Sequence, residues 1–550
     1  MPQSTANRAP SPADPLGPRA DAPRVLIIGA GPTGLGAAWR LRELGHANFA
    51  VLEAKPYAGG LAHSFVDDAG FTWDIGGHVM FSHYDYYDRV FDEVMGDDFA
   101  LNDRESWVRL RDTWVPYPFQ NNIRYLPPQD AADCLVGLIK AQGAEGPSHA
   151  DARNFGEFID AVFGEGIARL FMRPYNFKVW AYPPERMNKT WIGERVAVLD
   201  VERAVRNVVE QRDDFGWGPN NRFKFPLRGG TGEFYKRMAD ALSDHIRLST
   251  EVVSIDPAEK IARVRRPDGT TEELRYDMLI SAMPLDVLCA RIVQDVPDDV
   301  ASAAGGLLHS AGHMVGIGLR RPCPSTKSWM YFPEGNCPFY RVTYLSNYSP
   351  YMTPDQTGEN ATHYSLLCET SASPEKPVDP ATIVEQTIAG LENAGLLEPG
   401  ERADIESTWH HAVEYSYPTP SVDRDERLSV AIPWLERHGI YSRGRFGMWK
   451  YEVANTDHTL MQGVEVVDRL LLGKPEKTIG LVYRVTDDGR QAADHARPEV
   501  AGSGEKRLSA RTTQNSPADV EIEISSEASR KPPDPRVIPG TSDHMAPEAR

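Results

Sequence analysis

Apolar residues near the start of the chain fall into short runs separated by a stretch with helical spacing. Residues 24–28 (RVLII) form an apolar run suited to a buried parallel strand, and residues 49–54 (FAVLEA) form a second one. Between them, residues 34–45 carry apolar positions at the three- and four-residue spacing of an amphipathic helix. Strand, helix and strand in this order predict a βαβ unit with a parallel sheet.

Two other patterns follow this unit. Residues 128–215 are predicted to be mostly helical, because apolar residues recur three and four apart in DAADCLVGLIKAQ and FGEFIDAVFGEGIARLFM. Residues 300–420 contain short alternating runs such as HMVGIGL and HYSLLCE, which are typical of an antiparallel sheet. Residues 277–284 and 436–472 return to the first pattern. The sequence therefore predicts an α/β fold in which a Rossmann-type domain is interrupted by a helical insertion and by an antiparallel-sheet domain.

The two ends of the chain differ from this body. Residues 1–23 are rich in Pro, Ala and Asp, and no aromatic residue follows Tyr483. Such segments cannot bury enough surface to offset their ordering entropy, so both ends are predicted to be disordered. The predicted organisation is a disordered arm over 1–23, a nucleotide-binding domain over 24–127 that continues in about 221–300 and 436–475, a helical insertion with a flap over 128–220, a sheet domain over 301–435, and a disordered tail over 485–550.

Composition limits the partners of the 550-residue chain. With 59 Lys and Arg against 78 Asp and Glu, the formal net charge is −19, which opposes binding to nucleic acid or anionic lipid. An anionic ligand would instead need a few arginines placed inside a pocket. The five cysteines form no C-x-x-C pair and no cluster with histidine, so we expect no metal site, no disulfide framework and a reducing cytoplasm. No apolar run of about 18 residues predicts membrane insertion, and the N-terminus lacks the apolar region of a secretory signal. A homo-oligomer is compatible with the sequence.

A dinucleotide-binding fingerprint lies between the first strand and the helix. Gly29, Gly31 and Gly34 have the G-x-G-x-x-G spacing, with Pro32 and Thr33 between the last two glycines. Glycines at these positions let the backbone approach a pyrophosphate at the start of a helix. Glu53 follows nineteen residues after Gly34 and ends the second strand, where a carboxylate can accept the ribose hydroxyls. The alternative is a glycine-rich turn with an incidental glutamate, but strand, helix and acid together favour the nucleotide site.

The next glycines favour FAD over NAD. Gly59, Gly60 and Leu61 follow the ribose acid, where FAD proteins of the amine-oxidase and glutathione-reductase type carry a second glycine pair. Gly76 and Gly77 in FTWDIGGH can bring the backbone against an isoalloxazine ring. An NAD domain has no use for either pair, so the sequence predicts an amine-oxidase-like flavoprotein.

Flavoproteins with this opening include amine oxidases, desaturases, protoporphyrinogen oxidases and a family of sugar-nucleotide isomerases. A mean hydropathy of −0.43 argues against a desaturase. Dense segments that mix Arg, Tyr, Trp and Asn argue against a neutral substrate; they are WVPYPFQNN (114–122), FMRPYNFKVWAYPP (171–184), WIGERVA (191–197), YFPEGNCPFYR (331–341), YSYPTP (415–420) and SRGRFGMWKYEVANTDH (442–458).

In this order, these segments resemble the UDP-galactopyranose mutases of the eukaryotic (fungal and protozoan) type, from about Arg24 to about Leu472. One departure is Ala454, where the family pattern has Gly. The resemblance implies an FAD-dependent isomerase that converts UDP-galactopyranose to UDP-galactofuranose through a covalent adduct between the sugar and N5 of the reduced flavin. It also implies NADPH or NADH as reductant, and a supply of galactofuranose for surface glycans or the cell wall.

The resemblance assigns roles to individual residues. Arg195 and Arg341 would hold the diphosphate and His78 would lie beside the flavin, and these three form the predicted catalytic set. Tyrosine hydroxyls at 331, 417 and 451 would reach the same diphosphate. The residues assigned to uridine and the flap are Tyr117, Gln120, Asn176 and Trp180. The substrate pocket would also include Phe81, Tyr348 and Asn455, together with Tyr331, Tyr417 and Tyr451. The residues assigned to the flavin are Val252, Arg445, Asn455, Thr456 and Asp457.

Three alternatives stay open from the sequence. Arg195 and Arg341 could pair with core acids such as Glu194 or Glu334 and have only a structural role. The chain could be an amine oxidase or a protoporphyrinogen-oxidase-like oxidoreductase, although a neutral substrate would leave buried arginines unpaired at a cost. Finally, it could be a catalytically inactive FAD-binding protein that acts through its long ends.

Overall fold

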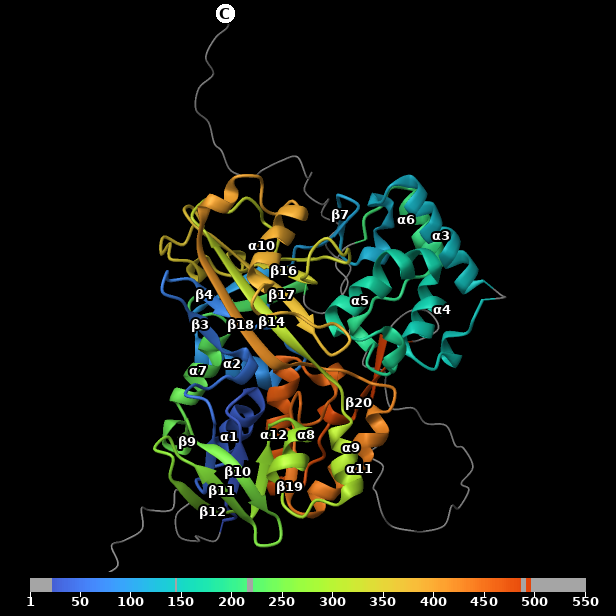
Figure 1. The fold of residues 1–550 in the computed structure, drawn as a ribbon. Coiled ribbons are helices and arrows are strands. Elements are labelled where there is room, and N and C mark those ends of the chain that lie inside the picture. The colour runs from blue at the N-terminus through green and yellow to red at the C-terminus, as the bar shows by residue number, and fades with distance from the viewer. Residues whose placement is uncertain (1–21, 144–145, 215–220, 486–490, 496–550) are drawn as a thin grey trace, which may run out of the picture. The chain divides into compact units, whose positions relative to one another are not determined.

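The structure is a computed structural model that describes residues 22–143, 146–214, 221–485 and 491–495 (Figure 1). A five-stranded parallel sheet forms the base of the nucleotide-binding region. Its strands, in order across the sheet, are β19 (Ile440–Ser442), β13 (Met278–Ser281), β1 (Val25–Ile28), β2 (Phe49–Leu52) and β9 (Ile246–Arg247).

Strand β1 is buried on both faces, as its continuous apolar run predicts. Val25 and Ile27 pack into one hydrophobic core, and Leu26 and Ile28 pack into another on the opposite face. The first core is covered by α1 (Pro32–Glu43), α2 (Asp85–Met95), α7 (Gly232–Asp240) and α12 (Thr456–Leu472). The second is covered by α8 (Leu285–Val287), α9 (Asp298–Gly305), α11 (Arg424–Arg437) and the antiparallel strands β10 (Glu251–Asp256), β11 (Ile261–Arg265) and β12 (Thr271–Arg275).

A seven-stranded sheet forms the second layer of the molecule and crosses the upper part of Figure 1. Its order is β18 (Ile405–Pro418), β14 (His309–Leu319), β17 (Tyr364–Ala372), β16 (Arg341–Tyr344), β15 (Trp329–Tyr331), β6 (Ser106–Leu110) and β7 (Thr113–Pro116). Helix α10 (Ile383–Asn393) contributes to the core on one face of this sheet.

Two features of this sheet differ from the sequence prediction. The pair β15–β6 is parallel, so the sheet is mixed rather than purely antiparallel. Strands β6 and β7 come from the segment predicted to belong to the nucleotide-binding domain, and they join the substrate-side sheet through Trp329–Tyr331. Pairing between segments more than two hundred residues apart leaves no local signal, because each strand shows only its own alternation.

The remaining strands make two short antiparallel pairs within the described part of the nucleotide-binding region. Strand β3 (Ser64–Val66) pairs with β4 (Thr72–Asp74), and β5 (Phe99–Asp103) pairs with β8 (Arg222–Pro226). The first pair carries the chain to Gly76 and Gly77.

The helical insertion lies beside the larger sheet, at the right of Figure 1. Its helices are α3 (Pro128–Gln142), α4 (Phe155–Ile167), α5 (Arg173–Trp180) and α6 (Val201–Val209), and a π-helical turn (Ala168–Met172) joins α4 to α5. The aromatic and aliphatic side chains of this region share one core with Tyr331, Tyr417 and Tyr451 at its edge. The insertion therefore borders the segments that the sequence predicts to bind substrate.

The end of the described chain differs from the prediction of a disordered tail. Leu481–Val485 (β20) pairs in antiparallel fashion with Gln491–His495 (β21). Such a ladder satisfies the hydrogen bonds of the backbone, which the absence of aromatic residues after Tyr483 does not prevent. The rest of that tail, and residues 1–21 of the predicted arm, lie outside the described residues. Among the described residues, the helices are all too short or too polar to cross a bilayer.

Candidate active site

The fingerprint glycines bring β1, α1 and the neighbouring loops into close contact. Gly29 has a left-handed φ of 97°, and a Cβ on Gly34 would lie 1.8 Å from the Gly29 carbonyl oxygen. Pro32 occupies the first turn of α1, and no side chain caps Gly31, the residue before the helix. The helix start is thus shaped by backbone alone, which is the form that a pyrophosphate site requires.

Glu53 and the second glycine pair close the same loop. The Glu53 carboxylate accepts hydrogen bonds from the backbone N–H of Ala30 and of Lys55, both at 2.9 Å. The backbone of Gly59 donates to the Ala30 carbonyl at 2.8 Å, and a Cβ on Gly60 would lie 3.2 Å from the Cα of Gly31. Leu61 is partly buried beside the second core. The predicted nucleotide-binding residues therefore converge on the start of α1.

The Gly76–Gly77–His78 loop faces the larger sheet. Gly76 has a φ of 94°, and a Cβ on Gly77 would come within 2.8 Å of the Thr343 hydroxyl oxygen. Burial, the field of Arg445 and that of Arg341 lower the pKa of His78 to about 4, against the opposing effect of Glu369. His78 is therefore neutral at physiological pH, and its Nδ1 is buried without a hydrogen-bond partner.

A cavity of about 230 Å³ lies between this loop, α12 and the larger sheet. It brings together residues from segments that span almost the whole body of the chain. The predicted residues that line it are Gly77, His78, Phe81, Tyr117, Arg195, Tyr331, Arg341, Tyr417, Arg445, Tyr451, Asn455, Thr456 and Asp457, and Val79, Trp329 and Ala454 complete the lining.

Three arginines of this lining form what we call the buried arginine group: Arg195, Arg341 and Arg445, each largely buried but still partly exposed. Arg195 donates to the side-chain oxygen of Asn455 at 2.7 Å and to the Glu452 carbonyl at 3.0 Å. Arg445 donates to the carbonyls of Ser416 and Ala454 at 2.9–3.1 Å. Main-chain and amide oxygens thus fix these two guanidinium groups, and burial lowers the pKa of Arg445, with Arg195 adding to that effect.

Arg341 is held differently, by a carboxylate that the sequence analysis missed. Its Nε and Nη2 donate to the two oxygens of Glu369 at 2.6 and 2.8 Å. Glu369 is 1% exposed on β17, and it is a lone charge in the apolar run YSLLCETSA. A charged residue in such an apolar run needs a partner of opposite charge when it is buried. The isolated glutamate was therefore the signal in the sequence that could have predicted an ion pair. The alternative that Arg341 pairs with a core acid is thus correct, but the acid is Glu369. Glu334, the acid named from the sequence, accepts from the backbone N–H of Arg111 instead.

Tyrosines cover the buried arginine group on the side of the helical insertion. The guanidinium carbon of Arg195 lies 5.2 Å from the Tyr451 ring centroid, and that of Arg445 lies 5.0 Å from the Tyr417 ring. Burial raises the pKa of Tyr417 to about 12, and it raises that of Tyr331 as well. These hydroxyls stay protonated and can donate to an anion.

Apart from the glycine-loop residues, Glu53 and their neighbours described above, five predicted residues lie outside this lining. Gln120 donates to the Ala197 carbonyl, and Asn176 donates to the Met172 carbonyl within the insertion. Trp180 is 1% exposed, with its ring edge-on to those of Trp191, Tyr417 and Tyr451. Tyr348 packs among Phe223, Phe225 and Trp329, and Val252 lies in the second hydrophobic core. In this structure each of these five side chains points into a core or bonds to a neighbouring carbonyl, and the binding roles assigned to them remain predictions.

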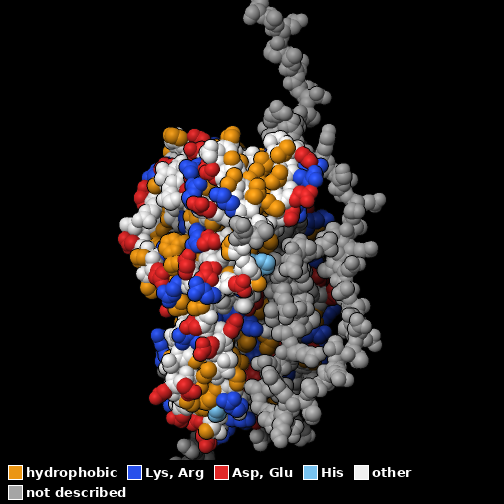
Figure 2. Space-filling model, turned by 90° about the vertical axis from the view of Figure 1, so that its right-hand side faces the viewer, with side chains coloured by type: hydrophobic (Ala, Val, Ile, Leu, Met, Phe, Trp, Pro, Cys, Tyr) orange, Lys and Arg blue, Asp and Glu red, His pale blue; other side chains and the backbone are white. Residues whose placement is uncertain are grey.

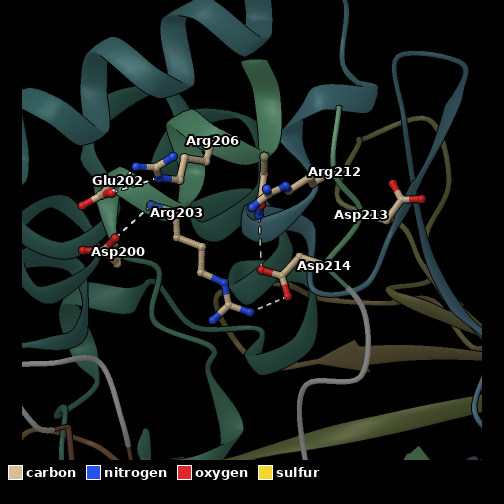
Figure 3. Close-up of a pocket in the computed structure, with 8 residues that line it drawn as sticks. Asp200, Glu202, Arg203, Arg206, Arg212, Asp213 and Asp214 are labelled. Atoms are coloured by element: carbon tan, nitrogen blue, oxygen red, sulfur yellow. Dashed lines mark hydrogen bonds and ion pairs between the residues drawn. The ribbon is translucent and has the colours of Figure 1, made fainter. Parts of the chain in front are cut away.

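A different cluster of arginines lines a surface hollow at α6, which we call the α6 arginine group: Arg203, Arg206 and Arg212 (Figure 3). Arg203 pairs with Asp214 at 2.5 Å, and Arg206 pairs with Glu202 at 2.8 Å. Arg212 pairs with Glu210 at 2.6 Å. Because each arginine has an acid beside it and the side chains are more than half exposed, this hollow offers little net attraction to an anion.

A His–Asp–His cluster borders the cavity at the start of α12. His83 Nδ1 lies 2.7 Å from an oxygen of Asp457, and His458 Nδ1 lies 3.3 Å from the same oxygen. The ligand atoms of the three residues lie within 4.8 Å of one another. The cluster has metal-ligating residue types, which the sequence analysis did not single out, and the expectation of no metal remains a prediction.

The comparisons with known proteins agree with the class that this fold and site define, a flavoprotein of the amine-oxidase type. The chain belongs to the flavin containing amine oxidoreductase family, which matches residues 32–471. The chain is also similar to a solved reduced UDP-galactopyranose mutase, with 45% identity and a TM-score of 0.78 over 83% of this chain and 96% of that one.

Other relatives are more distant. A putative protoporphyrinogen oxidase from Exiguobacterium sp. 255-15 shares 16% identity and a TM-score of 0.60 over 82% of this chain and 99% of that one, which shows the common fold. A 15-cis-phytoene desaturase of Glycine max is 33% identical over 19% of this chain and 16% of its own length. Amine oxidase A of Bos taurus is 23% identical over 47% of this chain and 49% of its own. The chain thus spans half or less of the curated relatives that it matches.

The residues present fit FAD. Backbone surrounds the start of α1, with Gly60 and Gly31 close together where a side chain would intrude. Glu53 lies at the carboxyl end of β2 beside this loop, in the position of a ribose acceptor. Gly77 and His78 border the cavity on the other side, and Thr456 and Asp457 present the start of α12 to it. A helix start stabilises negative charge, which suits a reduced flavin.

Proposed function

We propose that this protein is an FAD-dependent isomerase that interconverts UDP-galactopyranose and UDP-galactofuranose. The buried arginine group carries the proposal. Three guanidinium groups and four tyrosines face one cavity beside the flavin-type glycine loop. The similarity to a reduced UDP-galactopyranose mutase at 45% identity supports the same conclusion.

Each part of the proposed site has a task in this reaction. When bound in its reduced form, FAD supplies the electron pair that displaces UDP from the anomeric carbon. Arg195 and Arg341 bind the diphosphate and stabilise the charge that it gains on leaving, as preorganised cations in a dry site do. Tyr331, Tyr417 and Tyr451 donate hydroxyl hydrogens to the same oxygens. Neutral His78 leaves the cavity without a further cation beside the sugar.

The observations favour this substrate over that of an amine oxidase. A neutral lipophilic amine would offer no negative charge to the three guanidinium groups that line the cavity. A diphosphate offers several anionic oxygens that can accept charge-assisted hydrogen bonds from them. Bidentate contacts from arginine would each contribute about 1.5–3 kcal/mol. The cavity chemistry thus selects an anionic substrate.

The setting of the reaction is part of the same proposal. NADPH or NADH would reduce the flavin before turnover, without net oxidation of the sugar. The enzyme would act in the cytoplasm as a monomer or homo-oligomer and supply galactofuranose to cell-wall or surface glycans. The mutase family of fungi and protozoa is the proposed relative, with Ala454 in place of its glycine.

The proposal is tested by incubating dithionite-reduced protein with UDP-galactofuranose and separating the products by chromatography. UDP-galactopyranose is expected from the reduced protein, and none is expected from the oxidised protein. Amine or protoporphyrinogen oxidation by the same preparation, with no conversion of the sugar nucleotide, would contradict the proposal.

A further inference from the structure

Glu369 joins two parts of the candidate active site that are far apart in the sequence. One of its oxygens, Oε1, accepts from Arg341 Nε at 2.6 Å and from the backbone N–H of Gly77 at 3.1 Å. The other, Oε2, accepts from Arg341 Nη2 and from the Tyr340 hydroxyl, both at 2.8 Å. One carboxylate therefore holds a cavity guanidinium and the loop that carries His78 at the same time.

The surroundings of Glu369 make this arrangement specific. The carboxylate is 2% exposed, so water does not compete for its oxygens. Tyr340, which donates to it, also lies 3.1 Å from the Tyr417 hydroxyl, a member of the cavity lining. Burial raises the pKa of Glu369, but Arg341 and the hydrogen bonds outweigh burial and place the pKa below its usual value. The acid is ionised and all four of its contacts are donors.

Simple electrostatics assigns Glu369 an unfavourable role in binding an anion. A carboxylate beside Arg341 repels a diphosphate and neutralises the cation that would bind it. Its presence beside the cavity therefore needs another reason. The shared contact of Oε1 offers one, because the same oxygen accepts from Arg341 and from the backbone N–H of Gly77, the residue before His78.

We propose that Glu369 is a positioning residue that orients Arg341 and couples binding of the diphosphate to the conformation of the Gly76–His78 loop. This inference rests on the proposed function for the identity of the anion. It assigns no proton transfer to Glu369, because the ionised acid only accepts hydrogen bonds. Such coupling is reciprocal, so a change in the loop conformation, for example on reduction of a bound flavin, is expected to change the affinity for UDP through the same residue.

Glu369→Gln is the test variant, and Glu476→Gln is its matched control. A glutamine side chain has one oxygen that accepts and one NH2 group that donates. It therefore cannot accept all the hydrogen bonds that Arg341, Gly77 and Tyr340 donate to Glu369. Glu476 has the same bidentate geometry with buried Arg443, at 2.5 and 2.7 Å, but lines no part of the cavity. The control reports what loss of a buried ion pair does by itself.

UDP is titrated into the purified flavoprotein in its oxidised and dithionite-reduced states, with flavin absorbance as the signal. In the unmodified protein and in Glu476→Gln, the two Kd values are expected to differ at least fivefold. In Glu369→Gln, UDP is expected to bind at least tenfold more weakly, and the two Kd values to agree within twofold. Glu369→Asp, which keeps the charge but shortens the side chain, is expected to lie between these results.

Two outcomes overturn the inference. Tighter UDP binding by Glu369→Gln would show that the carboxylate acts only as a repelling charge. Equal Kd values for both redox states of the unmodified protein, or an unchanged ratio in Glu369→Gln, would remove the coupling. Failure of the proposed function is distinct, because it would appear as reduced protein that binds UDP with the expected ratio but does not convert UDP-galactofuranose.

Discussion

The buried arginine group and the α6 arginine group contain the same side chains but differ in what surrounds them. In the cavity, Arg195 and Arg445 donate to carbonyl and amide oxygens, and Arg341 forms an ion pair with Glu369. At α6, each of the three arginines has a carboxylate within 2.9 Å, and Figure 3 shows the pairs of Arg203 with Asp214 and of Arg206 with Glu202. The comparison shows that burial and the type of partner, not the number of arginines, separate a site prepared for an anion from a solvated surface.

The visible surface supports this distinction. In Figure 2, basic and acidic side chains alternate over the part of the face that is not covered by grey residues. Such mixing lets opposite charges cancel within a few ångströms, as at α6. In the cavity the three guanidinium groups are only partly exposed, so water screens their charges less and their effect on a bound anion is larger.

The largest expected effect is the difference in turnover between a variant of the buried arginine group and a variant of the α6 arginine group. Arg341→Ala is expected to lower turnover of UDP-galactofuranose roughly 10²–10³-fold, equivalent to about 3–4 kcal/mol of transition-state stabilisation. Arg206→Ala, in the α6 group, is expected to leave turnover within twofold. Steady-state kinetics on reduced protein measures both, with flavin content as the check that each variant is folded. Near-normal turnover by flavin-loaded Arg341→Ala would remove the difference between the groups.

A smaller loss of turnover is expected when Arg195 keeps its charge but loses the geometry of its guanidinium group. Arg195→Lys keeps the charge but loses the fork that reaches the Asn455 side chain and the Glu452 carbonyl together. Turnover is expected to fall about 10–100-fold with little change in flavin content. If the lysine variant equals the unmodified protein, a point charge is enough and the fixed geometry has no role.

These two groups also show what could be predicted from the sequence. The strand–turn–helix–strand unit of β1, α1 and β2 was predicted correctly because its signals lie within 30 residues of one another, and the nucleotide-binding roles of its glycines and Glu53 remain predictions. The mixed α/β fold class is likewise confirmed. The role of Glu369 and the parallel β15–β6 pair were not predicted, because both depend on contacts between residues more than two hundred positions apart. For Glu369 the local sequence shows only a single charge in an apolar strand. Long motifs located the arginines, but no local pattern specified their partners.

The electrostatics of the cavity should be visible in the pH dependence of stability. Burial, with Arg445 and Arg341, holds the pKa of His78 at about 4, against about 6.5 when unfolded. Between these pH values the unfolded chain therefore binds a proton that the folded chain does not. As pH falls from 6.5 to 4, His78 is expected to lower the free energy of unfolding by up to about 3 kcal/mol. His78→Asn should remove this part of the pH dependence in denaturant titrations of the flavoprotein. An unchanged slope would contradict the burial of a neutral imidazole.

The smallest effect is expected at the surface. Arg203→Ala breaks the pair with Asp214 on a side chain that is 60% exposed, so the free energy of unfolding should change by less than about 1 kcal/mol. Denaturant unfolding of the flavoprotein at low and high salt measures the change. A loss of several kcal/mol would mean that the α6 arginine group stabilises the fold and is not merely solvated.

Direct titration with UDP tests most sharply whether the buried arginine group is a diphosphate site. The unmodified flavoprotein and Arg206→Ala are expected to bind UDP with the same Kd, and Arg341→Ala is expected to bind it at least tenfold more weakly. Equal Kd values for all three proteins would show that the diphosphate lies elsewhere.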